Sequence, residues 1–259
     1  MIYHYTTLDT LRHLLTLGDS LEILADKSPV EINILFHATG VRFLNDTKEN
    51  QLLPAVFLEL EVPQDKLFAI DGIKGLPYVL SFSLDDDNLT MWRNYANDGK
   101  GIALGFDEKM IADSLELHVD FMGECEYIAV EDLKEKMSTD PLFIMYKSDP
   151  ENTAPLLSLY SKSLKYKHGA FAHEREYRIT FSCHADEDFF VRGDAIATYQ
   201  IVRIPFNALQ TIIVGPCLDF EKTRFSISRM MYRYLEGFPN QCQRILPCIY
   251  KSEAPYNSR

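Results

Sequence analysis

Two glutamates separated by one residue, Glu174 and Glu176, are the side chains of this sequence best suited to chemistry. They lie in residues 173–181, where apolar and polar residues alternate from Tyr177 to Phe181, a pattern that predicts a strand. Residues two apart on a strand point to the same side, so we expect both carboxylates at one strand mouth. Two interpretations stay open: a solvated strand end with ordinary ion pairs, or a carboxylate pair facing a cleft, where like charges shift each other's pKa.

The elements that must position this pair follow from hydrophobic periodicity along the chain. Strands are predicted at residues 2–5, 35–39, 55–62, 78–83, 101–106, 124–129, 189–191, 198–204, 211–214 and 245–250. Helices are predicted at residues 8–17, 89–96, 130–137, 155–167 and 220–235. The two kinds of signal do not alternate regularly, and no linker or repeat divides the chain. We therefore predict a single α+β domain over residues 1–259, with mixed or antiparallel sheets and flanking helices.

Composition narrows the class of protein. The net charge of −12 argues against broad binding to nucleic acid or to an anionic membrane. The five cysteines form no Cys-x-x-Cys pair, which favours reduced thiols in a cytoplasmic protein. Neither a secretion signal nor a segment long enough to span a bilayer is visible.

Several familiar motifs are ruled out by their spacing. Gly99, Gly101 and Gly105 precede a strand where a dinucleotide loop needs a helix. No phosphate loop, His-Glu-x-x-His or Gly-x-Ser-x-Gly occurs, and we expect no metal. The acidic run from Asp85 to Asp87 fits a helix N-terminus. A metal-dependent hydrolase that uses this run remains an alternative.

Eight blocks of the sequence, taken in order, resemble one mostly bacterial family, domain of unknown function 2971. They are residues 3–6, 42–46 with Glu49, 81–83, 91–96, 99–106, 174–178, 213–216 and 252–256. The chain departs from the family pattern in a long insertion at Asp26–Asn33, in Thr47, where Pro is frequent, and in Asn257, where Arg is usual.

The order of these blocks is also similar to that of the ADP-ribosyltransferase superfamily. Those enzymes carry a His or Arg on a first strand, Ser-x-Ser on a second, and Glu-x-Glu on a later one. In this chain His4, then Ser81 with Ser83, then Glu174 with Glu176 occupy that order. The resemblance implies an ADP-ribosyltransferase-like core that cleaves the nicotinamide–ribose bond of NAD. It further implies transfer of ADP-ribose to a protein, nucleic acid or small-molecule acceptor, in a toxin or anti-phage effector.

The resemblance also implies roles for individual residues. Glu176 would stabilise positive charge that develops on the ribose, and Glu174 would orient the acceptor. His4 would bond the adenine-side ribose and contribute to catalysis. The remaining residues expected to contact NAD are Thr6, Arg42 at the diphosphate, Ser81, Ser83 and Tyr95 as one of three candidate stacking rings.

The same positions allow a non-catalytic module of this fold that binds a nucleotide or a protein. In either case we expect at least one of Arg178 and Arg93 to pair with an acidic site residue or with the Arg42–Asp46 turn and hold it in place.

Overall fold

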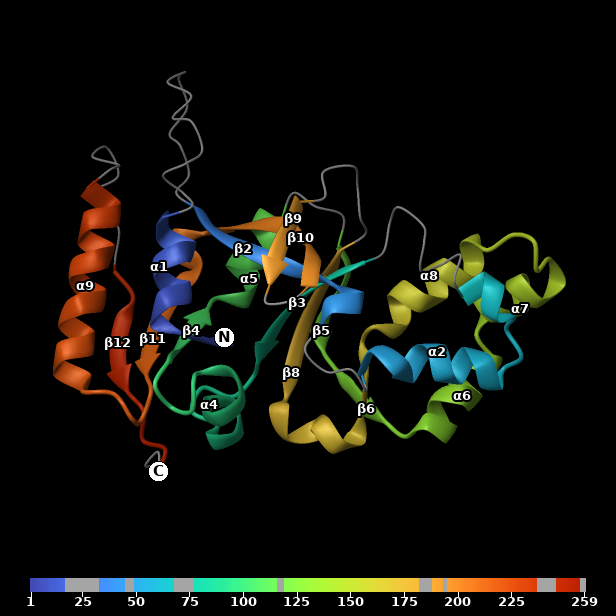
Figure 1. Cartoon of the computed structure of the whole chain (residues 1–259), viewed down its shortest axis with the longest axis horizontal. Coiled ribbons are helices and arrows are strands. Elements are labelled where there is room, and N and C mark those ends of the chain that lie inside the picture. The colour runs from blue at the N-terminus through green and yellow to red at the C-terminus, as the bar shows by residue number, and fades with distance from the viewer. Residues whose placement is uncertain are drawn as a thin grey trace, which may run out of the picture. The chain divides into compact units, whose positions relative to one another are not determined.

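The computed structural model describes residues 1–16, 33–44, 49–67, 77–115, 119–181, 188–192, 195–236 and 246–256. The chain divides into two compact units, whose elements are labelled in Figure 1. The first unit comprises Met1–Phe36, Phe82–Glu116 and Val202–Arg259, and the second comprises His37–Ser81 and Leu117–Ile201. Three strands contribute residues to both units: β2 (Asn33–Gly40), β3 (Tyr78–Ser83) and β10 (Ala195–Pro205).

The first unit is built on a mixed sheet. Its strand order is β12 (Cys248–Lys251), β11 (Leu209–Val214), β4 (Ile102–Phe106) and β1 (Ile2–Thr6). β11 runs parallel to β12 and antiparallel to β4, and β4 runs antiparallel to β1. Every residue of β4 is buried, as expected for a strand inside a sheet. The helices are α1 (Leu8–Thr16), α4 (Leu89–Tyr95), α5 (Glu108–Ser114), η4 (Phe206–Ala208) and α9 (Phe220–Glu236).

Local sequence explains where two of these helices begin. The side chain of Asn88 accepts hydrogen bonds from the backbone N–H groups of the first turn of α4, at 2.8 and 3.4 Å. Asp107 caps α5 in the same way, through the N–H of Met110 at 3.0 Å. Such caps satisfy backbone donors that have no partner inside the helix. The only tryptophan of the chain, Trp92, is fully buried on α4, and its ring meets that of Tyr5 edge-on with centroids 4.9 Å apart.

Close backbone packing in the first unit requires glycine at two positions. A Cβ on Gly101 would lie 2.2 Å from the backbone oxygen of Thr6, and one on Gly215 would lie 2.4 Å from that of Gly99. The N–H of Gly215 donates to the carbonyl of Gly101 at 2.9 Å. Gly101 therefore serves close backbone packing at the start of β4, a strand where a dinucleotide loop would need a helix.

The second unit joins a small amount of sheet to a helical core. Strands β5 (Val119–Glu124) and β8 (Glu176–Phe181) are antiparallel, and β6 (Glu126–Ile128) and β7 (Tyr166–His168) are parallel. β9 (Asp188–Arg192) pairs with β10. The helices are η2 (Val41–Phe43), α2 (Glu49–Glu59), α6 (Val130–Ser138), α7 (Pro141–Ser148), α8 (Ala154–Ser163) and η3 (Gly169–Glu174). Figure 1 shows α2, α6, α7 and α8 gathered together, and their buried apolar side chains form one core.

The predicted α+β class is confirmed, and most predicted elements are present. The strand predicted at residues 55–62 is wrong, because this segment belongs to α2. Leu52, Leu53, Val56 and Phe57 are buried there at helical spacing. The helix predicted at residues 155–167 ends at Ser163, and its last residues form β7.

The predicted strand through both glutamates is correct only from Glu176 onward. Glu174 ends η3, and Arg175 between them has a left-handed backbone with φ of 42°.

Two further findings concern the described residues alone. None of their helices combines the length and apolar character needed to cross a membrane. Their cysteines, Cys125, Cys217 and Cys248, are all free thiols.

Candidate functional site

The two glutamates lie at the start of β8 in the second unit. Glu176 is the first residue of the strand, and all six residues of β8 are buried. Cys125, which directly follows β5, donates its N–H to the carbonyl of Glu176 at 2.8 Å. The N–H of Glu176 donates to the Tyr127 hydroxyl at 2.6 Å. The backbone of Glu176 is therefore held on both sides.

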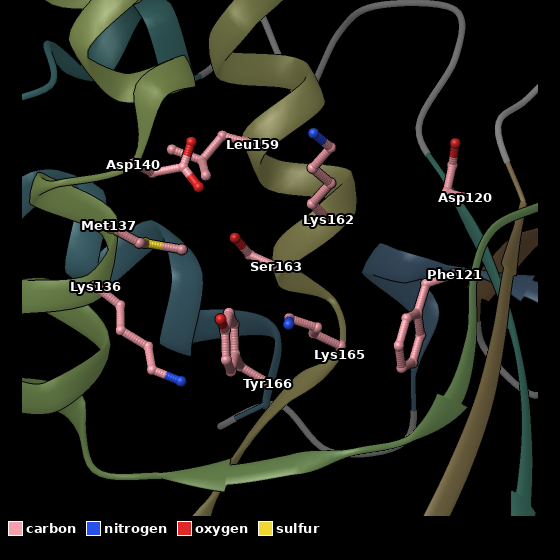
Figure 2. Close-up of a pocket in the computed structure, with 10 residues that line it drawn as sticks. All are labelled: Asp120, Phe121, Lys136, Met137, Asp140, Leu159, Lys162, Ser163, Lys165 and Tyr166. Atoms are coloured by element: carbon pink, nitrogen blue, oxygen red, sulfur yellow. The ribbon is translucent and has the colours of Figure 1, made fainter.

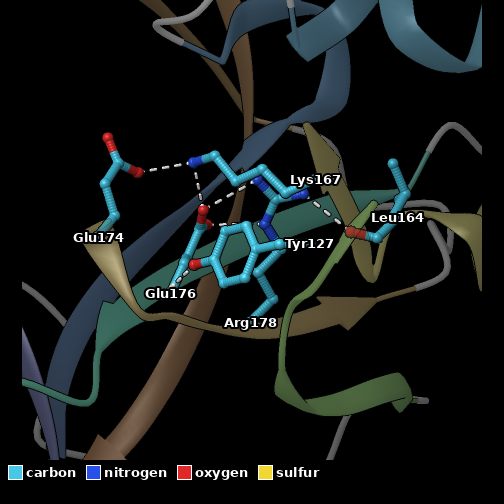
Figure 3. Close-up of polar contacts among 6 residues, drawn as sticks. All are labelled: Tyr127, Leu164, Lys167, Glu174, Glu176 and Arg178. Atoms are coloured by element: carbon cyan, nitrogen blue, oxygen red, sulfur yellow. Dashed lines mark hydrogen bonds and ion pairs between the residues drawn. The ribbon is translucent and has the colours of Figure 1, made fainter. Parts of the chain in front are cut away.

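Both carboxylates converge on one ammonium group, that of Lys167 from β7 (Figure 3). Its Nζ lies 2.7 Å from Oε2 of Glu174 and 2.5 Å from Oε2 of Glu176. All three side chains are buried, with relative exposures of 3%, 4% and 5% for Lys167, Glu174 and Glu176. The prediction that the carboxylates point to the same side is thus confirmed, although they reach that side from two different elements.

Arg178 completes this charged network, which we define as Lys167, Glu174, Glu176 and Arg178. Its Nε donates to Oε1 of Glu176 at 2.7 Å, and its Nη2 to Oε2 at 3.0 Å. Its Nη1 donates to the carbonyl of Leu164 at 2.8 Å. The arginine is buried, with 2% exposure. Its two hydrogen bonds to Glu176 confirm the prediction that Arg178 pairs with an acidic site residue. Arg93 instead lies over the ring of Tyr256, 5.8 Å from its centroid.

The electrostatics of the charged network follow from burial and from charge balance. Two cations and two anions sum to zero, so no net charge is buried. Burial raises the pKa of Glu176, against the opposing effects of Lys167 and of a hydrogen bond from Ser81. Burial alone would lower the pKa of Lys167, but Glu176 and Glu174 reverse this and raise it. Burial lowers the pKa of Arg178 to about 9, which leaves it charged at neutral pH.

Ser81 is the third predicted site residue found at this place, after Glu174 and Glu176. It belongs to the part of β3 that lies in the second unit, and its side chain hydrogen-bonds to Glu176. The sequence order had placed this serine and this glutamate in one site, and the structure brings them together. Arg42 lies in η2 of the same unit, but its side chain falls outside the described residues, as do Asn45 and Asp46.

The other predicted site residues belong to the first unit: His4, Thr6, Ser83 and Tyr95. The ring of His4 meets those of Phe36 and Phe82 edge-on, at 5.2 and 5.9 Å between centroids. Ser83 accepts a hydrogen bond from the N–H of Asp85 at 3.1 Å. Tyr95 packs against the apolar cluster around Trp92. Convergence of His4 with Glu176 in one pocket stays a prediction.

The acidic run after β3 has a structural task. Oδ1 of Asp87 accepts hydrogen bonds from Trp92 Nε1 and from the Ser252 hydroxyl, both at 2.6 Å. Its Oδ2 accepts the N–H of Glu253 at 2.6 Å. These bonds tie the segment after β12 to the start of α4. Among the described residues, no group of three or more His, Cys, Asp or Glu side chains is placed to hold a metal ion.

A protein-family model matches the part of the chain that contains the charged network. Residues 91–179 match the family model described as Protein of unknown function (DUF2971). The match supports the DUF2971 family. It includes all four residues of the charged network, together with Tyr95. The comparisons with curated proteins and with solved structures found no match.

A pocket that sequence patterns did not indicate lies within the DUF2971 match. It belongs to the second unit and has a volume of about 280 Å³. Figure 2 shows its lining, which comes from β5, α6, the start of α7, and α8 with the residues that follow it. The lining residues are Asp120, Phe121, Lys136, Met137, Asp140, Leu159, Lys162, Ser163, Lys165 and Tyr166. They come from five short segments, and no local motif joins them.

Proposed function

We propose that this chain is an NAD-using enzyme that transfers ADP-ribose, with Glu176 as its central catalytic residue. The observation that carries the proposal is the hydrogen bond between Ser81 and Glu176. The resemblance to ADP-ribosyltransferases assigns these two residues to one site on the basis of sequence alone. The match to DUF2971 is compatible with this activity but names none.

The proposed reaction breaks the bond between the nicotinamide nitrogen and C1′ of the ribose. The bonding electrons leave with nicotinamide, and positive oxocarbenium character develops on the sugar. A carboxylate held beside that carbon stabilises the charge. The acceptor then attacks C1′ and loses a proton, for which Glu174 is the proposed base or orienting group. Ser81 would fix the orientation of the Glu176 carboxylate.

Burial sets a condition on this mechanism. Both oxygens of Glu176 are bonded, Oε1 to Arg178 and Oε2 to Lys167 and Arg178. A ribose can approach only if the shortest of these contacts, that with Lys167, opens. The proposal therefore requires Lys167 to move away from Glu176 when NAD binds, while Arg178 keeps its hold on Oε1.

The test is nicotinamide release from labelled NAD, with candidate acceptors present. Loss of the Glu176 charge should slow the reaction about a hundredfold, on the order of 3 kcal/mol of transition-state stabilisation. Since Glu176→Gln also disturbs the charged network, rates must be normalised to the folded fraction. Glu174→Gln is the comparison variant: it removes one charge from the same ammonium contact, and it should slow nicotinamide release less than Glu176→Gln does, because the proposed role of Glu174 is with the acceptor. Release that survives in Glu176→Gln refutes the assignment.

A second candidate function, a non-catalytic binding module, is favoured by the saturation of Glu176. A carboxylate with every oxygen engaged by buried cations is suited to holding β8 against β7 and α8. This function predicts NAD or nucleotide binding without nicotinamide release, or no binding of NAD at all. Calorimetric titration of the wild-type chain with NAD, combined with the nicotinamide-release assay, separates these outcomes from the first proposal, which requires both binding and release.

Three finer statements belong with the enzymatic proposal. The α+β fold would contain an ADP-ribosyltransferase-like core within a single domain, and the protein would act in the cytoplasm. The acceptor would be a protein, a nucleic acid or a small molecule, as in a toxin or anti-phage effector. The roles given to His4, Thr6, Arg42, Ser83 and Tyr95 remain predictions of the same resemblance.

A further inference from the structure

The pocket of the second unit shares no residue with the charged network, and charged side chains of both signs line it. Three lysines line it, against the two carboxylates of Asp120 and Asp140. In Figure 2, the ring of Tyr166 lies between Lys136 and Lys165, with Ser163 beside it, whereas Lys162 and Asp140 lie at the opposite end of the view. The pocket therefore carries a cationic part, Lys136 and Lys165, and a second part where the carboxylate of Asp140 and the ammonium of Lys162 both lie.

The cationic part is held in place by two kinds of contact. Nζ of Lys136 and Nζ of Lys165 lie 5.0 and 4.9 Å from the Tyr166 ring centroid, both within cation–π range. Each ammonium also donates to one oxygen of Glu126, at 3.0 Å from Lys136 and 2.6 Å from Lys165. An ammonium has three N–H donors, so each lysine keeps donors for a ligand.

Two further lining residues add donors. Lys162 is exposed and forms no ion pair with any described residue. Ser163 is 2% exposed as a whole, and its hydroxyl points toward the middle of the pocket (Figure 2). A bound anion would therefore meet the ammonium groups of Lys136 from α6 and of Lys165 before β7, with the Ser163 hydroxyl beside them, and Lys162 of α8 would meet the other end of the ligand.

The Asp140 carboxylate in the second part limits which anion fits. Oδ1 of Asp140 caps α7 through the N–H of Leu142 at 2.8 Å, and its other oxygen accepts no hydrogen bond from a described residue. A carboxylate repels an anion but accepts hydrogen bonds from hydroxyl groups. A ligand that satisfies both parts carries an anionic group at one end and hydroxyls at the other. A phosphate monoester is the suitable anion, because its three terminal oxygens and double charge match several ammonium donors.

We propose that this pocket binds a small phosphorylated polyol, such as a sugar phosphate. The phosphate lies against Lys136 and Lys165 beside Tyr166, and the hydroxyls lie toward Asp140 and Lys162. Tyr166, Phe121 and Leu159 supply the apolar walls against which the carbon skeleton packs. A volume of about 280 Å³ is at the low end for ligand sites, which suits one sugar ring and excludes a whole dinucleotide. The proposal is thus independent of NAD chemistry at Glu176.

Calorimetric titration of the full chain at low ionic strength tests the proposal. The probes are ribose 5-phosphate, glucose 6-phosphate, inorganic phosphate, citrate and unphosphorylated ribose. We expect saturable binding of one sugar phosphate per chain, weaker binding of inorganic phosphate, and no measurable binding of ribose. Absence of saturable binding with both sugar phosphates overturns the proposal.

Lysine variants locate the site. Lys162→Ala and Lys165→Ala should each weaken sugar-phosphate binding about tenfold or more, since each removes a charged hydrogen-bond donor. Lys109→Ala is the matched control, because Lys109 is an exposed lysine of α5 in the first unit. Melting temperatures show whether each variant is folded. Because the two pocket variants change different lysines, one can still test the site if the other does not fold.

Three results would contradict parts of this assignment. Equal affinities for Lys109→Ala and both pocket variants would overturn the location. Equal binding of inorganic phosphate and the sugar phosphates would overturn the polyol part and identify free phosphate as the ligand. Binding of citrate as tight as that of the sugar phosphates would overturn the choice of phosphate over carboxylate.

Discussion

Replacing Arg178 with methionine should destabilise the second unit strongly. The variant removes three hydrogen bonds, at 2.7 and 3.0 Å to Glu176 and at 2.8 Å to the Leu164 carbonyl. It also leaves two buried carboxylates with one cation, a net charge of −1. Breaking a buried ion pair costs about 3–5 kcal/mol, and the unpartnered carbonyl adds to that loss. We therefore expect a loss on the order of 4 kcal/mol, a large part of a typical stability of about 5–15 kcal/mol.

Urea denaturation followed by circular dichroism measures this loss. The control is Arg229→Met, the same change at an exposed arginine of α9, which should stay within about 0.5 kcal/mol of wild type. A double variant sharpens the test. Arg178→Met combined with Glu176→Gln restores neutrality, because Lys167 keeps its contact with Glu174. Its loss should be smaller than the sum of the two single losses by about 0.5–3 kcal/mol.

Two results would refute this view of the network. One is an Arg178→Met stability equal to that of the Arg229→Met control. The other is strict additivity in the double variant, since residues that share buried charges should not behave independently.

Three smaller changes test other parts of the structure. Gly101→Ala should lower the melting temperature, because its Cβ would lie 2.2 Å from a backbone oxygen, whereas Gly169→Ala, with no atom within 4 Å, should not. Asp87→Ala should lower the melting temperature, because it leaves the buried Nε1 of Trp92 without the acceptor of its 2.6 Å hydrogen bond; an unchanged melting temperature would contradict that tie. Glu126→Gln should lower stability at neutral pH, because hydrogen bonds from Lys165 and Lys136 lower the pKa of Glu126 in the folded state. That stabilisation is lost as the pH falls below ~4 and the carboxylate is protonated, so wild type and variant should then converge in thermal melts.

The sequence predicted best where one element carries its own periodic signal. β1, β3, β4 and α9 are present within one or two residues of their predicted bounds, because alternation or helical spacing fixes them locally. The second half of α2 resembles a strand in sequence because it is rich in apolar residues. The buried pairs Leu52–Leu53 and Val56–Phe57 lie one helical turn apart, and that spacing is the signal that identifies the helix.

The candidate site was predictable only in its acidic half. Glu-x-Glu and Ser-x-Ser could be found by spacing, and Ser81 does meet Glu176. Lys167 was missed because it was assigned to the end of a helix, whereas it lies on β7 and points to the glutamates. Its partnership depends on the pairing of short strands, which leaves no local pattern. The same holds for the pocket lysines, which come from α6, from α8 and from the residue before β7.

Lys167 separates the structural and the catalytic interpretation of the charged network. If the network only holds β8 in place, the contact between Lys167 and Glu176 persists in every state of the protein. If Glu176 acts on a ribose, that contact must open, and a buried ammonium without a partner would be costly. Glu174 removes this cost, because it lies 2.7 Å from the same ammonium and keeps it neutralised when Glu176 is released. Glu174 therefore has a physical role in the proposed mechanism before any acceptor is bound: it holds the ammonium of Lys167, which Glu176 must release.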